Sequence, residues 1–421
     1  MAKTVLILGN GFDLAHGLPT KYSDFLNFCN IIYEINVSIQ SIYSYKLESD
    51  KIFPMKNYNK ILNDVRDKCI VFSDILRNYL NMLLSENNFY IMRRHGKIPD
   101  GYKEIGDRID KIYYLLKNNI WYNYFKVIFK NEKINGENWI DFESEISFII
   151  QILDRHTENI TNMYNKMLAQ MDNYIRFESK FNDFHHALHR YNLDIELKSV
   201  KEIRKIIYND LENLILALEI YLSFVKTIPI HLKSLDISES YNYIINFNYT
   251  HTYQMVYSEW ANLFNIHGAI NEEPNNMVLG IDEYWSEGER NNHTNFTIFK
   301  KFAQRIQKRT GIESYKWFDQ IKYLYKENNT NITKVYIFGH SLDVTDKDIL
   351  CDYLNDDATD VTIFCRDKET EGEYIANVIK IIGEKRLLEK VNQNPPKLKF
   401  VIQQDMLPIE KKDLSASEVV T

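Results

Sequence analysis

The chain has 421 residues, which is enough for one large domain with a long insertion or for two to three ordinary domains. Its 45% hydrophobic and 26% charged residues are ordinary for a globular protein, whereas 14 glycines and 8 prolines are few for this length. Lys and Arg number 51 against 58 Asp and Glu, a net charge of −7, which argues against a dedicated nucleic-acid or membrane-surface binder.

The cysteines and the N-terminus indicate the compartment. Four widely spaced cysteines form no CxxC pair and have no histidine at metal-ligand spacing, so we expect a reducing compartment and no metal. The apolar run at the N-terminus is too short for a signal-peptide core, and no uncharged stretch is long enough to span a bilayer. We therefore expect a cytoplasmic location and no membrane partner.

The chain begins with a strand and continues with a long helical stretch. Residues Thr4–Leu8 (TVLIL) form a short apolar run closed by glycine, which predicts a buried strand. Residues 22–238 carry helical patterns, interrupted at Asn87–Gly106 by glycine, proline and charges that predict an exposed loop. One helical stripe of apolar residues in this stretch consists of Phe142, Ile146, Ile149, Ile150 and Leu153.

After residue 238 the pattern changes to short apolar runs that alternate with helices such as the one predicted at Glu371–Val391. The predicted strands are Tyr243–Phe247, Leu263–Ile266, Met277–Leu279, Val335–Phe338, Val361–Phe364 and Leu398–Ile402. Such strands, separated by helices, indicate a mostly parallel sheet covered on both faces. The expected fold class is therefore α/β: a Rossmann-like, mostly parallel sheet with a large all-helical insertion after the first strand.

This fold class divides the chain into three stretches. Residues 1–21 supply the first strand and a glycine loop of the nucleotide-binding domain, and residues 22–238 form the helical insertion. Residues 239–421 supply the remainder of the Rossmann-like domain.

Polar residues follow the predicted strands in a recurring order: a small residue or glycine first, then Asn, His, Ser or Asp. Ligands of open parallel sheets bind beyond the carboxyl ends of the strands, so these residues are the candidate site. The recurrence, rather than any single residue, supports this interpretation.

The first of these turns is Gly9-Asn10-Gly11-Phe12-Asp13. Gly9 and Gly11 let backbone N–H groups approach a phosphate, and Asn10 and Asp13 can bind ribose hydroxyls or an amide. The alternative is a plain glycine turn in which Asp13 caps the next helix.

Asn248 and His267 are the candidate catalytic residues. A neutral histidine can take a proton from water or a ribose hydroxyl, and an asparagine amide can orient either. Thr250 follows Asn248 at the same strand end and is a candidate cofactor contact. In the alternative, His267 caps a turn before Gly268, and Asn246 or Asn248 forms a turn.

The turn after Val335–Phe338 supplies further candidate cofactor contacts: Gly339, His340, Ser341 and Asp343. It offers a hydroxyl and a backbone nest for phosphate or ribose. The alternative is a plain strand-to-helix turn capped by Ser341 or Asp343. A serine hydrolase is disfavoured because GHSLD lacks the GxSxG elbow.

Two charged segments each allow two interpretations. Asp141 and Glu143 either reach the pocket or occupy the first turn of a helix, where the dipole favours acids. The basic residues of the second segment either hold phosphates or RNA or, as we expect, form a solvated helix face. They are Lys300, Lys301, Arg305, Lys308 and Arg309.

Several of these segments resemble signatures of the AbiH family of bacterial phage abortive-infection proteins. In chain order they are ILGNGFDLAHGLPTKYSDFL (Ile7–Leu26), NWIDFE (Asn138–Glu143), INFNYTHT (Ile245–Thr252), NIHG (Asn265–Gly268) and FGHSLDVTDKDIL (Phe338–Leu350). The resemblance runs nearly from end to end and implies a defence effector.

A more distant likeness is to sirtuin-like domains of bacterial defence systems, which bind NAD and in many cases hydrolyse it. This likeness implies a sirtuin-like sheet in which Asn248 and His267 match a catalytic Asn and His. Residues Gly339–Leu342 match a cofactor-contacting loop. The chain departs from that pattern in having Thr250 where the pattern has Asp, and Gly9-Asn10-Gly11 where it has a GAG-type turn.

Our first hypothesis is an effector that binds NAD or a related nucleotide and hydrolyses the nicotinamide–ribose bond. NAD is then the substrate or ligand, and we expect no metal. The alternatives are a non-catalytic nucleotide-binding sensor or interaction module, and a nuclease in which Asp13, Asp141 and Glu143 gather a metal. Candidate partners are the nucleotide, a phage component as trigger, and a second copy of the chain.

Overall fold

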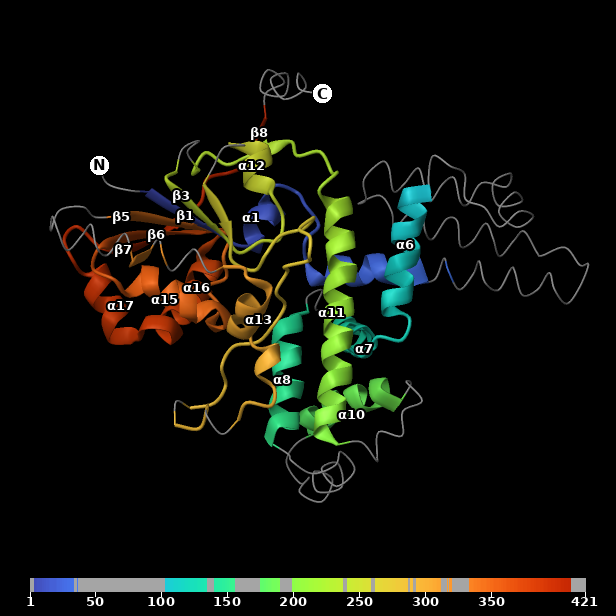
Figure 1. Ribbon diagram of the computed structural model, residues 1–421. Helices are drawn as coiled ribbons and strands as arrows, with labels where there is room; N and C mark the ends of the chain where they lie inside the picture. Colours follow the sequence, from blue (N-terminus) through green and yellow to red (C-terminus); the bar gives the residue numbers. More distant parts are fainter. Residues whose placement is uncertain are drawn as a thin grey trace, which may run out of the picture. The chain divides into compact units, whose positions relative to one another are not determined.

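The computed structural model describes residues 4–33, 36, 103–134, 140–155, 175–189, 199–237, 241–258, 262–286, 288–290, 293–311, 316, 318–319 and 333–409. They form two compact units (Figure 1). The first, called here the sheet unit, consists of Met1–Thr20, Pro229–Asn292 and Thr297–Thr421. The second, called the helical unit, consists of Lys21–Ile228 and His293–Phe296.

The sheet unit is built on one parallel sheet. Its six strands are β1 (Thr4–Leu8), β3 (Tyr243–Asn246), β4 (Leu263–Asn265), β5 (Thr333–Phe338), β6 (Thr359–Cys365) and β7 (Leu398–Ile402). They lie in the order β4-β3-β1-β5-β6-β7, and every neighbouring pair is parallel. The predicted Rossmann-like α/β fold class is confirmed. The carboxyl ends of β4, β3, β1 and β5 consequently share one edge of the sheet.

Within the sheet unit, helices cover both faces of the sheet. The helices are α1 (Asn10–Ala15), α12 (Thr252–Val256), α13 (Lys301–Lys308), α15 (Lys347–Asn355), α16 (Lys368–Ile382) and α17 (Glu384–Val391), with 3-10 turns η5 (Thr297–Phe299) and η6 (Val344–Asp346). Val5 and Ile7 face a core shared with α15 and α16, whereas Leu6 and Leu8 face Phe12 of α1. Burial on both faces explains why the strand sequence is continuously apolar.

One predicted strand is absent from the structure, and two helical predictions were wrong in part. Met277–Leu279 is buried but is not a strand. The helix predicted at Glu371–Val391 is two helices, because Gly383 takes a φ of +83° between α16 and α17. A short antiparallel pair, β2 (Leu232–Lys233) with β8 (Leu407–Pro408), lies partly in the stretch predicted to be helical.

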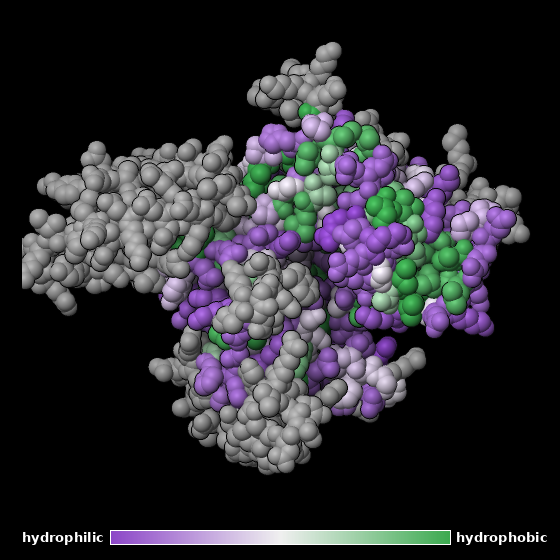
Figure 2. All heavy atoms as spheres, turned by 180° about the vertical axis from the view of Figure 1, so that it is seen from behind, coloured by the Kyte–Doolittle hydropathy of each residue, from purple (hydrophilic) through white to green (hydrophobic). Residues whose placement is uncertain are grey.

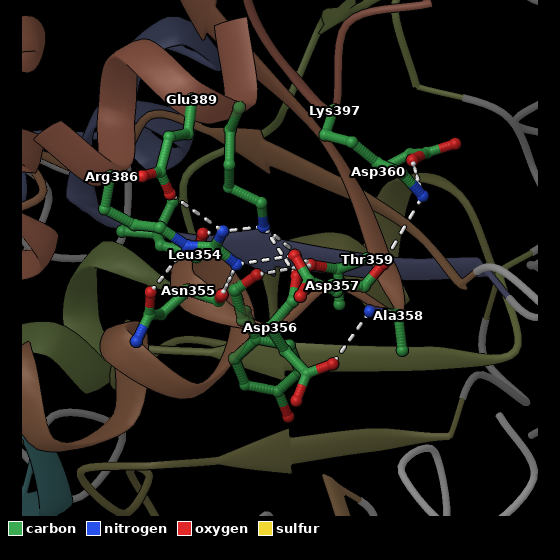
Figure 3. Close-up of polar contacts among 12 residues, drawn as sticks. Leu354, Asn355, Asp356, Asp357, Ala358, Thr359, Asp360, Arg386, Glu389 and Lys397 are labelled. Carbon is green, nitrogen blue, oxygen red and sulfur yellow. Dashed lines mark hydrogen bonds and ion pairs between the residues drawn. The ribbon is translucent and has the colours of Figure 1, made fainter. Parts of the chain in front are cut away.

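Polar contacts fix α17 against the end of α15. Lys390 is fully buried and donates to the carbonyls of Leu354 and Asp356 at 2.8 and 2.6 Å. Burial lowers the pKa of Lys390 to about 8. Figure 3 shows the surrounding pairs, in which Arg386 reaches Asp357. These contacts supply partners for carbonyls at the C-terminal end of α15 that its own helix leaves open.

The described part of the helical unit consists of packed helices. They are α6 (Lys103–Leu116), α7 (Ile120–Ile134), α8 (Phe142–Arg155), α10 (Ile175–His189) and α11 (Val200–Val225), and residues 22–33 are also helical. The predicted stripe on α8 is fully buried, and Phe142 stacks on Tyr22 and Phe125 at ring-centroid distances of 4.3 and 4.0 Å. Of the loop predicted at Asn87–Gly106, residues 87–102 lie outside the described residues, and residues 103–106 begin α6.

The surface carries both hydrophilic and hydrophobic patches on the face seen from behind (Figure 2). Exposed apolar side chains of the sheet unit include Leu235, Ile306 and Leu388. Within the part of the chain that the structure describes, no helix is long and apolar enough to cross a membrane.

Candidate functional site

The turn after β1 packs directly on the turn after β5. The Gly11 amide donates to the Gly339 carbonyl at 2.7 Å. A Cβ on Gly9 would lie 2.5 Å from the His340 Cα, and one on Gly339, whose φ is +67°, would lie 2.1 Å from the Phe12 nitrogen. Close packing of the two turns therefore explains why glycine is needed there. The phosphate contact proposed for Gly9 and Gly11 stays a prediction.

We expect Gly339→Ala to lower the free energy of unfolding by about 2–3 kcal/mol. Alanine would have to adopt a left-handed backbone conformation, and its Cβ would have to displace the β1 turn. Gly372→Ala is the matched control. Gly372 lies within α16 with open space around it, so alanine should stabilise the helix by about 1 kcal/mol. Urea unfolding followed by circular dichroism measures both. Equal effects of the two substitutions would contradict the packing argument.

Asn248 ties the turn after β3 to the turn after β1. Its Nδ2 donates to the Gly9 carbonyl at 3.0 Å. Asn246 forms the β3 turn itself, accepting from the Asn248 amide at 3.2 Å and donating to the Thr250 carbonyl at 3.0 Å. The turn-forming role that the sequence allowed for either asparagine thus belongs to Asn246.

His267, two residues after β4, forms a buried pair with Asp346. Its Nε2 lies 2.9 Å from Asp346 Oδ1, and its buried Nδ1 has no hydrogen-bonding partner among the described residues. Burial lowers the pKa of His267 to about 4, against the opposing charge of Asp346. The ring is therefore neutral at pH 7, with Nε2–H donated to the carboxylate and Nδ1 left as the basic nitrogen. The side chain does not cap the turn before Gly268.

Asp346 is the centre of this cluster. Lys301 Nζ lies 2.9 Å from Asp346 Oδ1 and also donates to the Thr345 hydroxyl at 3.1 Å. His340 Nε2 lies 3.7 Å from Oδ2. Although burial acts in the opposite direction, Lys301 and then His267 hold the pKa of Asp346 well below its ordinary range. Asp346 therefore remains ionised inside the protein.

The Phe247 ring contacts both histidines of the cluster. Its ring meets His340 edge-on at 4.4 Å and His267 at 5.4 Å between centroids. His340 is also buried, its pKa is lowered by burial to about 4, and its Nδ1 accepts from the Leu342 amide at 2.9 Å. Because β3 and β4 pair in parallel, Asn248 and His267, each two residues beyond its strand, come from adjacent strand ends of the same unit.

The solvated face predicted for the basic segment was wrong for three of its five residues, whereas Lys308 is half-buried and Arg309 is exposed. Lys300, Lys301 and Arg305 are only 2–3% exposed. Lys300 pairs with Glu283 at 2.8 Å, and Arg305 pairs with Asp348. Within the sheet unit the charged face of α13 therefore points inward, where its cations neutralise buried or half-buried carboxylates.

Asp13 lies buried in α1 beside the β3 turn. Its Oδ2 accepts the Thr250 hydroxyl at 2.5 Å, and the Thr252 hydroxyl donates to Thr250 Oγ1 at 3.1 Å. Burial raises the pKa of Asp13 to about 6, and the hydroxyls of Thr250 and Thr252 and the nearby Asn248 amide offset part of this effect. Asp13 is not the helix cap that the sequence allowed, since Gly9 occupies that position.

The folded-state pKa of Asp13 lies above the unfolded value, so its contribution to stability is present below pH 3.8 and is lost as pH rises through about 6. The free energy of unfolding of Asp13→Asn, relative to that of the original chain, should therefore increase by about 3 kcal/mol as the pH rises from about 4 to about 8. Asp367→Asn is the control with the opposite sign, because hydrogen bonds from Thr370 lower the pKa of Asp367. Unfolding curves across this pH range measure both, and a flat difference for Asp13→Asn would refute the assignment.

The remaining candidate residues of the turns lie at the surface or in caps. Asn10 is exposed and accepts the Thr20 hydroxyl at 2.6 Å. Ser341 is exposed, and its carbonyl accepts from Asn377 at 3.0 Å. Asp343 caps η6 by accepting the Thr345 amide at 2.9 Å, as the capping alternative has it.

The acids considered for a metal belong to different units. Asp13 lies in the sheet unit, whereas Asp141 and Glu143 lie in the helical unit, where Asp141 accepts the Glu143 amide at 3.0 Å at the start of α8. Glu143 occupies the first turn of α8. Among the described residues no group of three His, Cys, Asp or Glu is placed to hold a metal ion.

The sheet and its strand-end turns define a Rossmann-like α/β protein with a buried His–Asp–Lys cluster at the carboxyl edge. The chain belongs to the AbiH family of bacteriophage abortive-infection proteins, whose family model matches residues 5–366. Searches of curated proteins and of solved structures found no match. The likeness to sirtuin-like domains therefore stays a prediction.

Proposed function

We propose that this abortive-infection protein binds NAD or a related nucleotide at the strand ends of its sheet unit and hydrolyses the nicotinamide–ribose bond. The observation that carries the proposal is the buried contact of His267 Nε2 with Asp346 Oδ1 at 2.9 Å, which leaves Nδ1 without a hydrogen-bonding partner among the described residues. Because burial lowers the pKa of His267 to about 4, we infer a neutral imidazole with Nδ1 unprotonated. A histidine held by a carboxylate in this way is a common arrangement for a general base.

The proposed step uses water as the nucleophile. Water oxygen attacks C1′ of the nicotinamide ribose while His267 Nδ1 takes the water proton. The C1′–N bond breaks, and its electron pair goes to the pyridine nitrogen. The products are ADP-ribose, nicotinamide and one proton, and the positive charge that develops on His267 is stabilised by the ionised Asp346.

Other side chains position the substrate. Because Asn248 Nδ2 is engaged by the Gly9 carbonyl, Oδ1 is the amide atom that would hold a ribose hydroxyl. The exposed Asn10 and Ser341 are placed on neighbouring turns, where a phosphate or ribose from solvent can reach them. The proposed cofactor contacts also include Gly9, Gly11, Gly339, His340 and Asp343.

The test is incubation of purified protein with NAD, with nicotinamide measured by chromatography. We expect nicotinamide and ADP-ribose in equal amounts. Infected-cell extract is added in a parallel reaction, because a phage component is the proposed trigger. If no nicotinamide appears in either reaction, hydrolysis of NAD is excluded as the activity.

One observation favours a second function, a nucleotide-binding module without turnover. His267 is only 5% exposed, and its Nδ1 is shielded from solvent. In that case the His267–Asp346 pair holds the turns in place for binding, and the chain acts by contacting a phage component or a second copy of itself.

A further inference from the structure

One oxygen of the Asp13 carboxyl group accepts no hydrogen bond from the described residues. Oδ2 accepts the Thr250 hydroxyl at 2.5 Å, while Oδ1, equally shielded from solvent, has no hydrogen-bonding partner in the described part of the chain. A buried acceptor without a donor costs about 1–3 kcal/mol, so such an atom indicates either strain or a missing ligand.

The position of Asp13 favours a ligand. The residue lies on α1 directly after the Gly9–Gly11 turn, 1% exposed, and Thr250 links it to the same β3 turn that carries Asn248. Asn248 in turn holds the Gly9 carbonyl. Asp13 therefore faces the strand-end edge at which the proposed nucleotide binds, rather than the core behind α1.

We propose that Asp13 Oδ1 accepts a ribose hydroxyl of the bound nucleotide, so that nucleotide binding is coupled to loss of a proton from Asp13. This inference rests on the proposed function and adds to it the ligand group and its proton linkage. The phosphates of a dinucleotide carry only acceptors and negative charge, which a carboxylate repels. Ribose hydroxyls are small uncharged donors and match the atom that lacks one.

The direction of the coupling follows from the hydrogen bond. A donor at Oδ1 stabilises the ionised carboxylate, so binding lowers the pKa of Asp13 from about 6 and releases a proton. Affinity for the nucleotide should consequently increase as pH rises toward about 6 and then level off. At about pH 6, roughly half a proton should leave per nucleotide bound, and much less at about pH 8.

No charged side chain faces Asp13 in the described residues. From the β3 turn and α12 it meets Asn248, Thr250 and Thr252. Beyond the β1 turn is His340, neutral near pH 6 because burial lowers its pKa to about 4. His16, three residues after Asp13, hydrogen-bonds to the Phe12 carbonyl and the Tyr257 hydroxyl, and burial lowers the pKa of His16 as well.

The experiment is isothermal titration of the full chain with ADP-ribose, which carries both riboses and has no nicotinamide bond to hydrolyse. Heats measured in buffers of different ionisation enthalpy give the number of protons released. We expect release with ADP-ribose in the original chain and none with Asp13→Asn. Asp110→Asn is the matched control, because burial also raises the pKa of Asp110, which lies on α6. Proton release on ADP-ribose binding should be the same in this variant as in the original chain.

Thr250→Val provides a second variant that does not depend on Asp13→Asn folding. Without the Thr250 hydroxyl the pKa of Asp13 rises further, so proton release should move to higher pH. Nicotinamide, which has no ribose, should cause no release in any variant.

The outcomes separate the inference from the proposed function. ADP-ribose binding with the same proton release in Asp13→Asn overturns the inference even if NAD is hydrolysed. Release that depends on Asp13 supports it even if no nicotinamide forms from NAD. Absence of ADP-ribose binding overturns it as well.

Discussion

Asp346→Asn is expected to lower the free energy of unfolding by about 3–5 kcal/mol near neutral pH. The Asp346 carboxylate lies 2.9 Å from Lys301 Nζ, and the two side chains are only 10% and 4% exposed. A neutral amide would leave the Lys301 ammonium without a counter-charge in a medium of low dielectric constant. Removing one partner of a buried ion pair costs more than the intact pair contributes.

The pH dependence gives this prediction its sign. The pKa of Asp346 is held well below 3.8 in the folded chain, so its stabilisation is present above about pH 4 and is lost on acidification. The loss caused by Asp346→Asn should therefore be largest at neutral pH and should shrink below about pH 4.

Asp357→Asn is the matched control. Asp357 pairs with Arg386 at 2.6 Å, but its side chain is 66% exposed. Solvent screens such a pair, so its removal should cost about 1 kcal/mol or less. Urea unfolding of both variants, followed by circular dichroism, measures the difference. Similar losses in the two variants would show that Asp346 and Lys301 do not form a buried pair.

The strands could be predicted from sequence because parallel strands buried on both faces are continuously apolar. Val335–Phe338 and Val361–Phe364 fall within β5 and β6 for this reason. Met277–Leu279 has the same pattern but is not a strand. The Val278 amide donates to the His267 carbonyl, and the Leu279 amide and carbonyl bond the side chain of Gln304. Hydrogen bonds from a side chain distant in sequence, such as that of Gln304, cannot be predicted from the local pattern of apolar residues.

The cluster around Asp346 could be predicted only in part. His267 could be singled out because it directly follows a predicted strand, whereas Lys301 comes from a helix for which the sequence allows either of two faces to be buried. In α13, Lys301 and Arg305 are four residues apart, and so are the apolar Phe302 and Ile306. The rule that apolar residues lie inside selects the wrong face: Phe302 and Ile306 are 41% and 67% exposed. The acids that draw the basic face inward, Asp346 and Asp348, lie about forty residues away in sequence.

His267→Asn is expected to lower kcat for NAD hydrolysis by about 10²–10⁴-fold, the usual contribution of a general base. KM and the affinity for ADP-ribose should change little, because the proposed base acts on water rather than on the bound nucleotide. His231→Asn is the control, since His231 is exposed and its backbone, not its ring, bonds Ile409. Initial rates at saturating NAD measure both variants.

The pH profile distinguishes a buried base from an ordinary one. Burial lowers the pKa of His267 to about 4, so the imidazole stays neutral down to well below pH 6. We expect kcat to stay level from about pH 8 to about pH 5.5, whereas an unperturbed histidine would halve it near pH 6.5. A fall in kcat centred near pH 6.5 would contradict the assignment of His267 as the base.

The same variant separates catalysis from binding in cells challenged with phage. If hydrolysis protects the cells, His267→Asn should abolish protection while the purified protein still binds ADP-ribose. If nucleotide binding alone protects them, a variant that retains affinity should retain protection as well. Loss of both affinity and protection would point to a structural role, in which the His267–Asp346 pair holds the β4 and β5 turns together. If the free energy of unfolding of the variant is close to that of the original chain, the structural change is confined to these turns.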